Sequence, residues 1–262
     1  MEQKIIDLFA GVGGLSLGAA RAGFNVVGAI ELDDHAIATH AKNFPSTRHI
    51  QKNIHDLTAK EIFEDLKIVK GELSGVIGGP PCQGFSSMGK RDLEDPRNNL
   101  FNDFFRLVSE LEPDFFVAEN VTGILNDKYK DIRKAALSHV EEKYDLLNPI
   151  KIKASDFGAP TIRTRIFFIG FRKNKFKNTL NEGDFYKHAL KSITVDQALK
   201  GLPQKIESTW LKETDSWQPI NKEEFGEELF FEKLIGDIPL NIGDKESIKK
   251  YPCRDCPYTF NL

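Results

Sequence analysis

One cysteine of this sequence stands in a setting that suits a nucleophile. Cys82 follows two glycines and two prolines in GGPPCQGFSS (78–87), directly after the short run SGVI (74–77). Prolines fix φ and glycines admit backbone shapes that other residues resist, so this loop is stiff and holds the thiol in one orientation. A thiol mounted in this way can attack an electrophilic carbon. The alternative is that Cys82 is a small buried hydrophobic residue, as most free cysteines are.

A glycine-rich turn indicates a second site, one for a nucleotide-like ligand. DLFAGVGG (7–14) follows a predicted strand and precedes a predicted helix. Glycines there let a ligand approach the outward N–H groups of a helix N-terminus. Glu31, at the end of the next strand, stands where an acid accepts hydrogen bonds from ribose hydroxyls. Because Ser16 takes the final position of the G-x-G-x-x-G/A pattern, a nicotinamide cofactor is disfavoured; a turn needed only for packing is the other interpretation.

Two further polar motifs lie at the ends of predicted strands. Glu119 lies in AENV (118–121) where one strand ends, and Arg163 and Arg165 precede the last strand. Ligands of open parallel sheets bind beyond the carboxyl ends of the strands, so Glu119 can share one cleft with Cys82 and the glycine turn. Arginines near that edge either form structural ion pairs or hold a phosphate or base carbonyl through two hydrogen bonds.

The elements that must position these groups alternate between short apolar strands and helices from residue 4 to about 172. Such alternation predicts an α/β fold with a mainly parallel, doubly wound sheet that carries helices on both faces. Asp33 or Asp34 is expected to cap the second helix. The predicted strands are 5–9, 25–32, 74–79, 114–121, 149–154 and 165–170, and the predicted helices are 15–23, 33–44, 59–66, 99–111 and 130–143.

Composition limits the class of protein. A chain of 262 residues allows one large domain, or one domain with a smaller appendage, and 40% hydrophobic with 29% charged residues suits a water-soluble globular protein. The sequence shows neither an apolar run of bilayer length nor the layout of a signal peptide, and three cysteines favour a reducing compartment. A net charge of −3 does not by itself indicate nucleic-acid binding, although phosphate contacts need only a local basic surface.

In this order the motifs resemble the C5-cytosine DNA methyltransferase family, over residues 5–171. DLFAGVGG is similar to the cofactor loop of the family, and AIELD to its ribose-binding segment. GGPPCQGFS resembles the nucleophile loop, AENV the glutamate motif, and ASDFGAPTIRTRIFFIG the arginine motif. The resemblance implies a Rossmann-like, S-adenosylmethionine-dependent methyltransferase fold, whose sheet is mainly parallel with an antiparallel strand at the end.

The resemblance also implies a binding site for S-adenosyl-L-methionine. Glu31 is expected to hold the ribose hydroxyls. Asn53 stands where the family usually has Asp beside the adenine, and its amide oxygen can accept a hydrogen bond from the adenine amino group without bringing a charge. The expected cofactor residues are Phe9, Ala10, Gly11, Gly13, Glu31, Leu32, Asn53, Ile54, Pro81 and Leu100.

Catalytic roles are implied for five residues. Cys82 is expected to add to C6 of a cytosine, which places electron density on C5, the atom that accepts the methyl group. A protonated or proton-sharing Glu119 would hydrogen-bond N3 and the exocyclic amine, and Arg165 would hold O2. Arg163 would steady the Cys82 loop or a flanking phosphate, and Asn120 would brace the Pro-Pro turn. The base that removes the C5 proton is not named by the sequence; water is a candidate.

A cytosine inside a duplex must swing out of the stack before this chemistry, at a cost of a few kcal/mol. The stretch after Cys82 is expected to clamp DNA or to fill the vacated space, with a solvated surface loop as the alternative. The expected DNA-binding residues are Gln83, Ser86, Lys90, Arg91 and Arg97.

The sequence after residue 172 departs from the family pattern. The family continues into a target-recognition region, a further helix and a segment with an Asn-Ser pair, and that final pattern does not occur here. Three explanations stay open: a truncated chain, one subunit of a split enzyme whose second polypeptide supplies the missing parts, or an inactive relic. The filled motif positions favour the first two. We expect a catalytic domain at 1–172, a linker at 173–195 and a partial target-recognition or partner-binding region at 196–262.

The leading hypothesis is a DNA (cytosine-5-)-methyltransferase of a restriction-modification system, which acts on double-stranded DNA in the prokaryotic cytoplasm without membrane attachment. A tRNA cytosine methyltransferase shares most of these motifs, but GFS after PPCQ favours DNA. A non-catalytic regulatory subunit is disfavoured because Cys82 and Glu119 are both present. No metal is expected, since CRDC (253–256) offers two of the four ligands that a structural zinc site needs.

Overall fold

The computed structural model describes residues 3–81, 98–176, 180 and 182–198. Contacts within the chain divide it into two units. The first comprises Met1–Ile152 and Thr164–Lys187, and the second comprises Lys153–Arg163 and His188–Leu262. The expected domain boundaries after residues 172 and 195 stay predictions, because residues 199–262 lie outside the described part of the chain.

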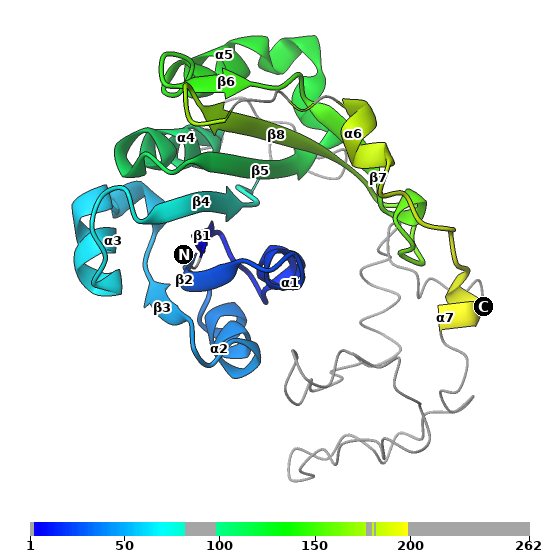
Figure 1. The fold of residues 1–262 in the computed structure, drawn as a ribbon, viewed down its shortest axis with the longest axis horizontal. Coiled ribbons are helices and arrows are strands. Elements are labelled where there is room, and N and C mark those ends of the chain that lie inside the picture. Colours follow the sequence, from blue (N-terminus) through cyan, green and yellow to red (C-terminus); the bar gives the residue numbers. More distant parts are fainter. Residues whose placement is uncertain (1–2, 82–97, 177–179, 181, 199–262) are drawn as a thin grey trace, which may run out of the picture. The chain divides into compact units, whose positions relative to one another are not determined.

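An eight-stranded sheet runs in the order β3-β2-β1-β4-β5-β8-β6, with β7 paired to β8 (Figure 1). Every pair among β1 to β5 is parallel, whereas β8 runs antiparallel to both β5 and β6. This confirms the predicted mainly parallel sheet with an antiparallel strand at the end. The strands are β1 (Lys4–Leu8), β2 (Asn25–Glu31), β3 (Arg48–Gln51), β4 (Leu73–Gly78), β5 (Phe115–Val121), β6 (Tyr144–Leu146), β7 (Ile150–Lys153) and β8 (Thr164–Arg172).

The helices also follow the predicted order. They are α1 (Gly14–Arg21), α2 (Asp34–Asn43), α3 (Ala59–Leu66), α4 (Asn98–Leu111), α5 (Lys130–Ser138), α6 (Glu182–Tyr186) and α7 (Val195–Ala198). Asp33 caps α2, because its side chain accepts a hydrogen bond from the N–H of Ala36 at 2.7 Å. Within the described residues no helix has the length and apolar character to cross a membrane.

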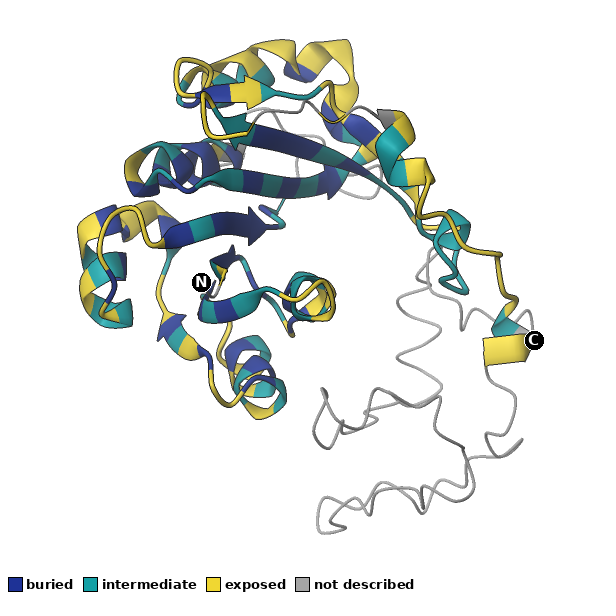
Figure 2. Cartoon of the chain, viewed as in Figure 1, coloured by how far each residue is buried: buried dark blue, intermediate teal, exposed yellow. Residues whose placement is uncertain are grey.

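Side chains of the central strands alternate between two apolar layers. Ile6 of β1 and Phe116 of β5 belong to the larger core, which also contains side chains from α3, α4 and α5. The adjacent Ile5 and Phe115 belong to a smaller cluster with Leu15 of α1. Helices therefore cover both faces of the sheet, as predicted, and the residues of β1 and β5 are buried or half-buried along the whole of these strands (Figure 2).

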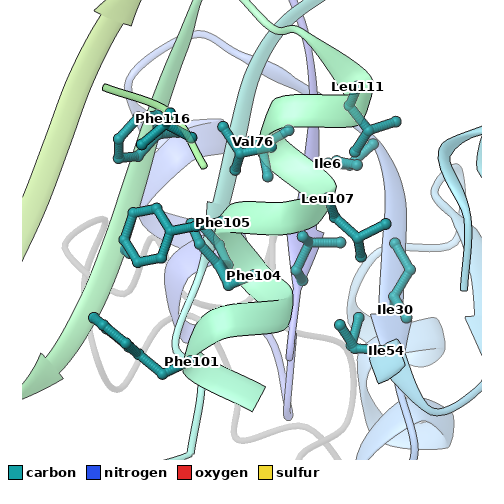
Figure 3. Close-up of a cluster of buried hydrophobic side chains, with 14 of the residues drawn as sticks. Ile6, Ile30, Ile54, Val76, Phe101, Phe104, Phe105, Leu107, Leu111 and Phe116 are labelled. Carbon is teal, nitrogen blue, oxygen red and sulfur yellow. The ribbon is translucent and has the colours of Figure 1, made fainter. Parts of the chain in front are cut away.

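Helix α4 supplies the densest part of the larger core (Figure 3). Phe101, Phe104, Phe105 and Val108 recur at helical spacing and are fully buried. The Phe105 ring meets the Phe116 ring of β5 edge-on, with 5.5 Å between centroids. Burial of each phenylalanine contributes about 2–3 kcal/mol, so α4 holds the adjoining β4 and β5 firmly in place. Both strands end at the candidate site.

Candidate active site

The carboxyl ends of four parallel strands align along one edge of the sheet. Leu8 of β1 is paired with Ile30 of β2 and with Gly78 of β4, and Gly78 is paired with Ala118 of β5. The residues that follow these four therefore leave the sheet at the same edge. Neighbouring strands lie about 4.8 Å apart, which puts the β2 and β5 ends about 14 Å from each other, a span that suits an elongated ligand.

The turn after β1 has an uncommon backbone conformation. Phe9, Gly11 and Gly13 have positive φ angles of 63°, 53° and 102°. Phe9 carries a side chain in a region that side chains disfavour, and strain of this kind clusters at binding sites. A Cβ atom on Gly13 would lie 2.5 Å from Cε2 of Phe44, so only glycine fits there. Packing and backbone conformation thus both require the glycine turn.

Glu31 ties this turn to the end of β2. Its Oε2 accepts a hydrogen bond from the N–H of Gly11 at 2.8 Å, and its Oε1 accepts from Leu32 at 2.8 Å and Asp33 at 3.0 Å. Three backbone amides therefore orient the carboxylate. Oε1 already accepts two of these bonds, whereas Oε2 accepts one and has a second lone pair for a ligand hydroxyl. Beside it, the apolar side chains of Val12 and Leu32 are 59% and 60% exposed. The site thus offers both an oriented acceptor and apolar surface.

The other predicted cofactor residues differ in exposure. Ala10 and Ile54 are buried, so little of either side chain is accessible to a ligand. Pro81, after β4, and Leu100, in the first turn of α4, are half-buried and keep accessible surface. Their contact with a cofactor stays a prediction.

The Asn53 side chain already has a structural role. Its Oδ1 accepts a hydrogen bond from the N–H of His55 at 3.1 Å and caps the 3-10 helix Ile54–Asp56. The second lone pair of that oxygen leaves the predicted adenine contact possible. Arg106 of α4, which sequence reasoning missed, holds the same turn by donating to the carbonyl oxygens of Leu57 at 3.0 Å and Ile54 at 3.1 Å.

Glu119 and Arg165 form an ion pair at the β5 end of the edge. Arg165 lies opposite Val121 in the antiparallel β5–β8 pair, diagonal to Glu119, and its Nε is 2.9 Å from Glu119 Oε1. The side chain of Arg165 is 16% exposed and that of Glu119 is 24% exposed, so the pair is partly desolvated and still accessible. A Cβ on Gly79 would lie 3.4 Å from Glu119 Oε2, an ordinary van der Waals contact, so the carboxylate lies directly against this glycine.

The residue after Glu119 points to the opposite face of β5 and holds the chain after β4. Asn120 is 2% exposed, and its Nδ2 donates to the carbonyl oxygen of Pro80 at 3.4 Å. Its Oδ1 accepts from the N–H of Val121 at 2.8 Å. The bond to Pro80 joins Asn120 to the Pro-Pro segment, and its predicted catalytic role stays a prediction. Gly78 is required just before that turn, because a Cβ there would lie 2.2 Å from the Leu8 carbonyl oxygen.

The structure does not place several predicted residues relative to this edge. Arg163 belongs to the second unit and is exposed, and its carbonyl oxygen accepts from the N–H of Ala154 at 2.8 Å. Its catalytic role stays a prediction. The expected nucleophile, the expected DNA-binding residues and the two cysteines near the end lie outside the described residues; they are Cys82, Gln83, Ser86, Lys90, Arg91, Arg97, Cys253 and Cys256.

Sequence reasoning also missed three buried polar side chains close to the glycine turn. Asp7 of β1, Ser16 of α1 and His40 of α2 are all fully buried. The available signal was Asp7 itself, since a charged residue inside the apolar run KIIDLF is rarely buried without a partner. These groups do not make a metal site: among the described residues, His, Cys, Asp and Glu form no cluster that could hold an ion.

Comparison with known sequences identifies relatives along most of the chain. A family model described as C-5 cytosine-specific DNA methylase matches residues 3–233. Type II methyltransferase M.DdeI of Desulfomicrobium norvegicum is 46% identical over 178 residues, which cover 66% of this chain and 41% of that protein. Type II methyltransferase M.AquIA of Picosynechococcus sp. is 36% identical over 224 residues, which cover 78% of this chain and 90% of that protein. The match to M.XorII, like that to M.DdeI, spans about two fifths of the relative.

Solved structures show the same architecture. A prophage-encoded protein of E. coli, described as a DNA modification methyltransferase, superposes with a TM-score of 0.76 and 50% sequence identity, covering 95% of this chain and 68% of that chain. The Spodoptera frugiperda DNMT2 structure superposes with a TM-score of 0.53 and 26% identity, covering 68% of this chain and 53% of that one. The likeness confirms the expected Rossmann-like methyltransferase fold.

Proposed function

Because the chain belongs to the C-5 cytosine-specific DNA methylase family, we propose that it transfers a methyl group from S-adenosylmethionine to C5 of a cytosine in duplex DNA. The type II methyltransferases among its relatives favour a role in restriction-modification. The observation that carries the proposal is the Glu119–Arg165 ion pair, which lies on the same sheet edge as Glu31 and the glycine turn. One end of this edge suits a cofactor and the other a cytosine.

The residues around the glycine turn fit S-adenosylmethionine. The carboxylate of Glu31 is oriented to accept hydrogen bonds from a ribose, and the strained turn lets a ligand approach the backbone. The exposed Val12 and Leu32 side chains would be covered by an apolar face of the cofactor. When bound, the cofactor supplies an electrophilic methyl group on a sulfonium sulfur.

Cys82 carries the covalent step in this proposal. Its thiolate forms a bond to C6 of the cytosine, and the π electrons of the C5–C6 double bond form the new bond from C5 to the methyl carbon. The methyl–sulfur bond breaks with its electron pair on sulfur, which yields S-adenosylhomocysteine. A base then takes the C5 proton, the C5–C6 double bond re-forms, and Cys82 leaves as a thiolate.

Glu119 and Arg165 hold the base during this step. A proton shared between the Glu119 carboxyl and N3 offsets the charge that develops on the ring as the thiolate adds. Arg165 can donate to the O2 of cytosine while it pairs with Glu119, because a guanidinium has five N–H groups. A flipped-out cytosine is required, since neither side chain can reach a base inside the stack.

Methyl transfer from labelled S-adenosylmethionine tests the proposal. Duplex DNA and tRNA are offered to the chain alone and to the chain with the product of an adjacent reading frame. We expect label in DNA, none after Cys82→Ser, and undiminished label after Cys253→Ser, which removes another cysteine. Label in tRNA alone would replace DNA with RNA as the substrate. No label with any substrate or partner would favour a regulatory subunit.

The covalent adduct has its own test. A duplex with 5-fluorocytosine at the target position cannot lose a C5 proton, so the enzyme should stay attached to the DNA. We expect a denaturation-resistant complex whose peptide map places the base on Cys82. Methylation of normal DNA without such an adduct would contradict the covalent mechanism and keep the methyltransferase assignment.

A further inference from the structure

Four side chains from four different elements form one hydrogen-bonded chain under the glycine turn. Ser16 Oγ lies 2.7 Å from Asp7 Oδ2 and 3.0 Å from His40 Nε2, and His40 Nδ1 lies 2.9 Å from His49 Nε2. The chain thus links β1, α1, α2 and β3. We call Asp7, Ser16, His40 and His49 the polar chain.

The polar chain touches the turn through His40. A Cβ built on Gly13 would lie 3.1 Å from Cδ2 of His40 and 2.5 Å from Cε2 of Phe44, so both rings pack directly against this glycine. The two rings also pack against each other, with centroids 4.5 Å apart. Ser16 lies in the first turn of α1, directly after the glycine turn. A shift of the His40 ring would therefore move the backbone that Glu31 holds from the other side.

Burial keeps the polar chain largely uncharged. Burial, together with the neighbouring His49 ring, lowers the pKa of His40 to about 4, and burial also lowers the pKa of His49. Burial raises the pKa of Asp7 to about 7, and Oδ1 of Asp7 has no hydrogen-bond partner among the described residues. The charged neighbours are Glu31, which raises the pKa of Asp7 further, and Arg48, which lowers that of His49.

We propose that the polar chain positions the glycine turn for S-adenosylmethionine, with the uncharged ring of His40 as its central link. The inference rests on the proposed function, because it concerns the cofactor of that reaction. Ser16 and His40 act through the backbone of the turn and not on the reacting atoms, so they are positioning residues. Their loss should weaken cofactor binding and leave the methyl-transfer step itself nearly unchanged.

Calorimetric titration of the full chain with S-adenosylhomocysteine compares the wild type with three variants at pH 7. His40→Leu removes both ring hydrogen bonds and should raise Kd about tenfold. His40→Gln keeps one polar end toward Ser16 and should give a smaller increase. His35→Gln is the matched control on the same helix, since His35 is 95% exposed, and its Kd should equal that of the wild type. In DNA methylation assays, His40→Leu should raise KM for the cofactor and leave kcat within about twofold.

A spectroscopic readout separates this role from general packing. The ¹⁵N shifts of the His40 ring in the wild type should report an uncharged imidazole from pH 8 down to pH 6. Folded His40→Leu or His40→Gln that binds S-adenosylhomocysteine as the wild type does would overturn the proposal, as would a protonated His40 ring at pH 7. If His40→Leu does not fold, the outcome for His40→Gln decides. A wild type that does not bind S-adenosylhomocysteine contradicts the proposed function itself, whereas equal binding by all four proteins contradicts only the polar chain.

Discussion

Two carboxylates at opposite ends of β strands have opposite environments. Asp7 lies in β1 and is fully buried, with hydrogen bonds from Ser16 and, in the described part of the chain, no cation beside it; burial raises its pKa to about 7. Glu112 lies just before β5, where Lys143, Lys70 and Arg172 each approach its carboxylate to between 2.8 and 3.1 Å. The hydrogen bond from Lys143 is the main cause that lowers the pKa of Glu112 to about 2.

The difference distinguishes a functional site from a structural ion cluster. We call Glu112 with Lys70, Lys143 and Arg172 the anchor. At the amino edge, Glu112, between α4 and β5, pairs with Lys70 before β4, Lys143 before β6 and Arg172 of β8, and this arrangement stabilises the fold. At the carboxyl edge, where we propose that the cofactor binds, Asp7 is buried without a cation among the described residues, and its neutral form is favoured because an unpaired buried charge is costly. Within the described residues, the three-cation cluster of Glu112 thus lies at the opposite edge from the candidate site.

The largest expected effect comes from Asp7→Asn, which removes the titration and keeps the shape. Because the folded-state pKa of Asp7 is raised from 3.8 to about 7, wild-type stability falls as pH rises through that window. The asparagine variant lacks this slope. Urea unfolding should therefore show the variant gaining about 3 kcal/mol on the wild type between pH 5 and pH 8. A difference that stays constant with pH would mean that Asp7 is charged in the folded protein at both pH values.

Asp34→Asn is the control for this measurement. Asp34 follows the cap of α2 and is 71% exposed, so its replacement controls for the loss of one carboxylate at the surface. Any common slope in the two variants would come from groups other than Asp7.

A smaller effect on stability is expected for Glu112→Gln, which removes the carboxylate that the three cations of the anchor share. The folded-state pKa of Glu112 lies below its ordinary value, so its contribution is present above pH 4.5 and is lost as pH falls toward about 2. At pH 7 the variant should lose about 2 kcal/mol, after allowance for solvent screening, and the loss should shrink by about half at pH 3. The midpoints of urea unfolding at pH 7 and pH 3 measure this loss of stability. Glu64→Gln, which touches only an exposed pair with Lys60, should stay within about 0.5 kcal/mol.

The sequence predicted most of the sheet because its central strands are continuous apolar runs between glycine turns. It did not predict β3 (RHIQ) or β6 (YDL), which are short and have one buried residue each. Their strand conformation comes from pairing with β2 and β8, which no local pattern records. Likewise α5 ends at Ser138, five residues before its predicted end, because Val140 and Tyr144 turn inward to the core.

The residues of the candidate site also differ in how far the sequence could predict them. Glu31, Glu119 and Arg165 could be predicted because motifs fix them at strand ends, and the register then brings those ends to one edge. His40 could not be predicted, because its partners Ser16 and His49 lie 24 and 9 residues away and its role exists only after α1, α2 and β3 have packed. From the sequence, Ser16 was only an argument against a nicotinamide cofactor. In the structure its hydroxyl connects Asp7 to His40 within the polar chain.

Glu119 is intermediate between Asp7 and Glu112 in burial and pairing. Of the three carboxylates, we expect its replacement to change the stability of the fold least. It pairs with Arg165 and is 24% exposed, whereas Glu112 pairs with three cations and Asp7 is fully buried. Glu119→Gln keeps the volume and should change the free energy of unfolding by less than about 1 kcal/mol.

The same substitution should nevertheless lower the methylation rate about a hundredfold or more, because an amide cannot share a proton with N3. Calorimetry should show unchanged binding of S-adenosylhomocysteine, since Glu31 and the glycine turn are untouched. Glu142→Gln, at an exposed position outside the site, controls for the loss of a charge. If Glu119→Gln lost activity only in proportion to lost stability, the Glu119–Arg165 pair would be a second anchor. Full stability with abolished transfer would instead show that this carboxylate is kept at the open edge for its proton.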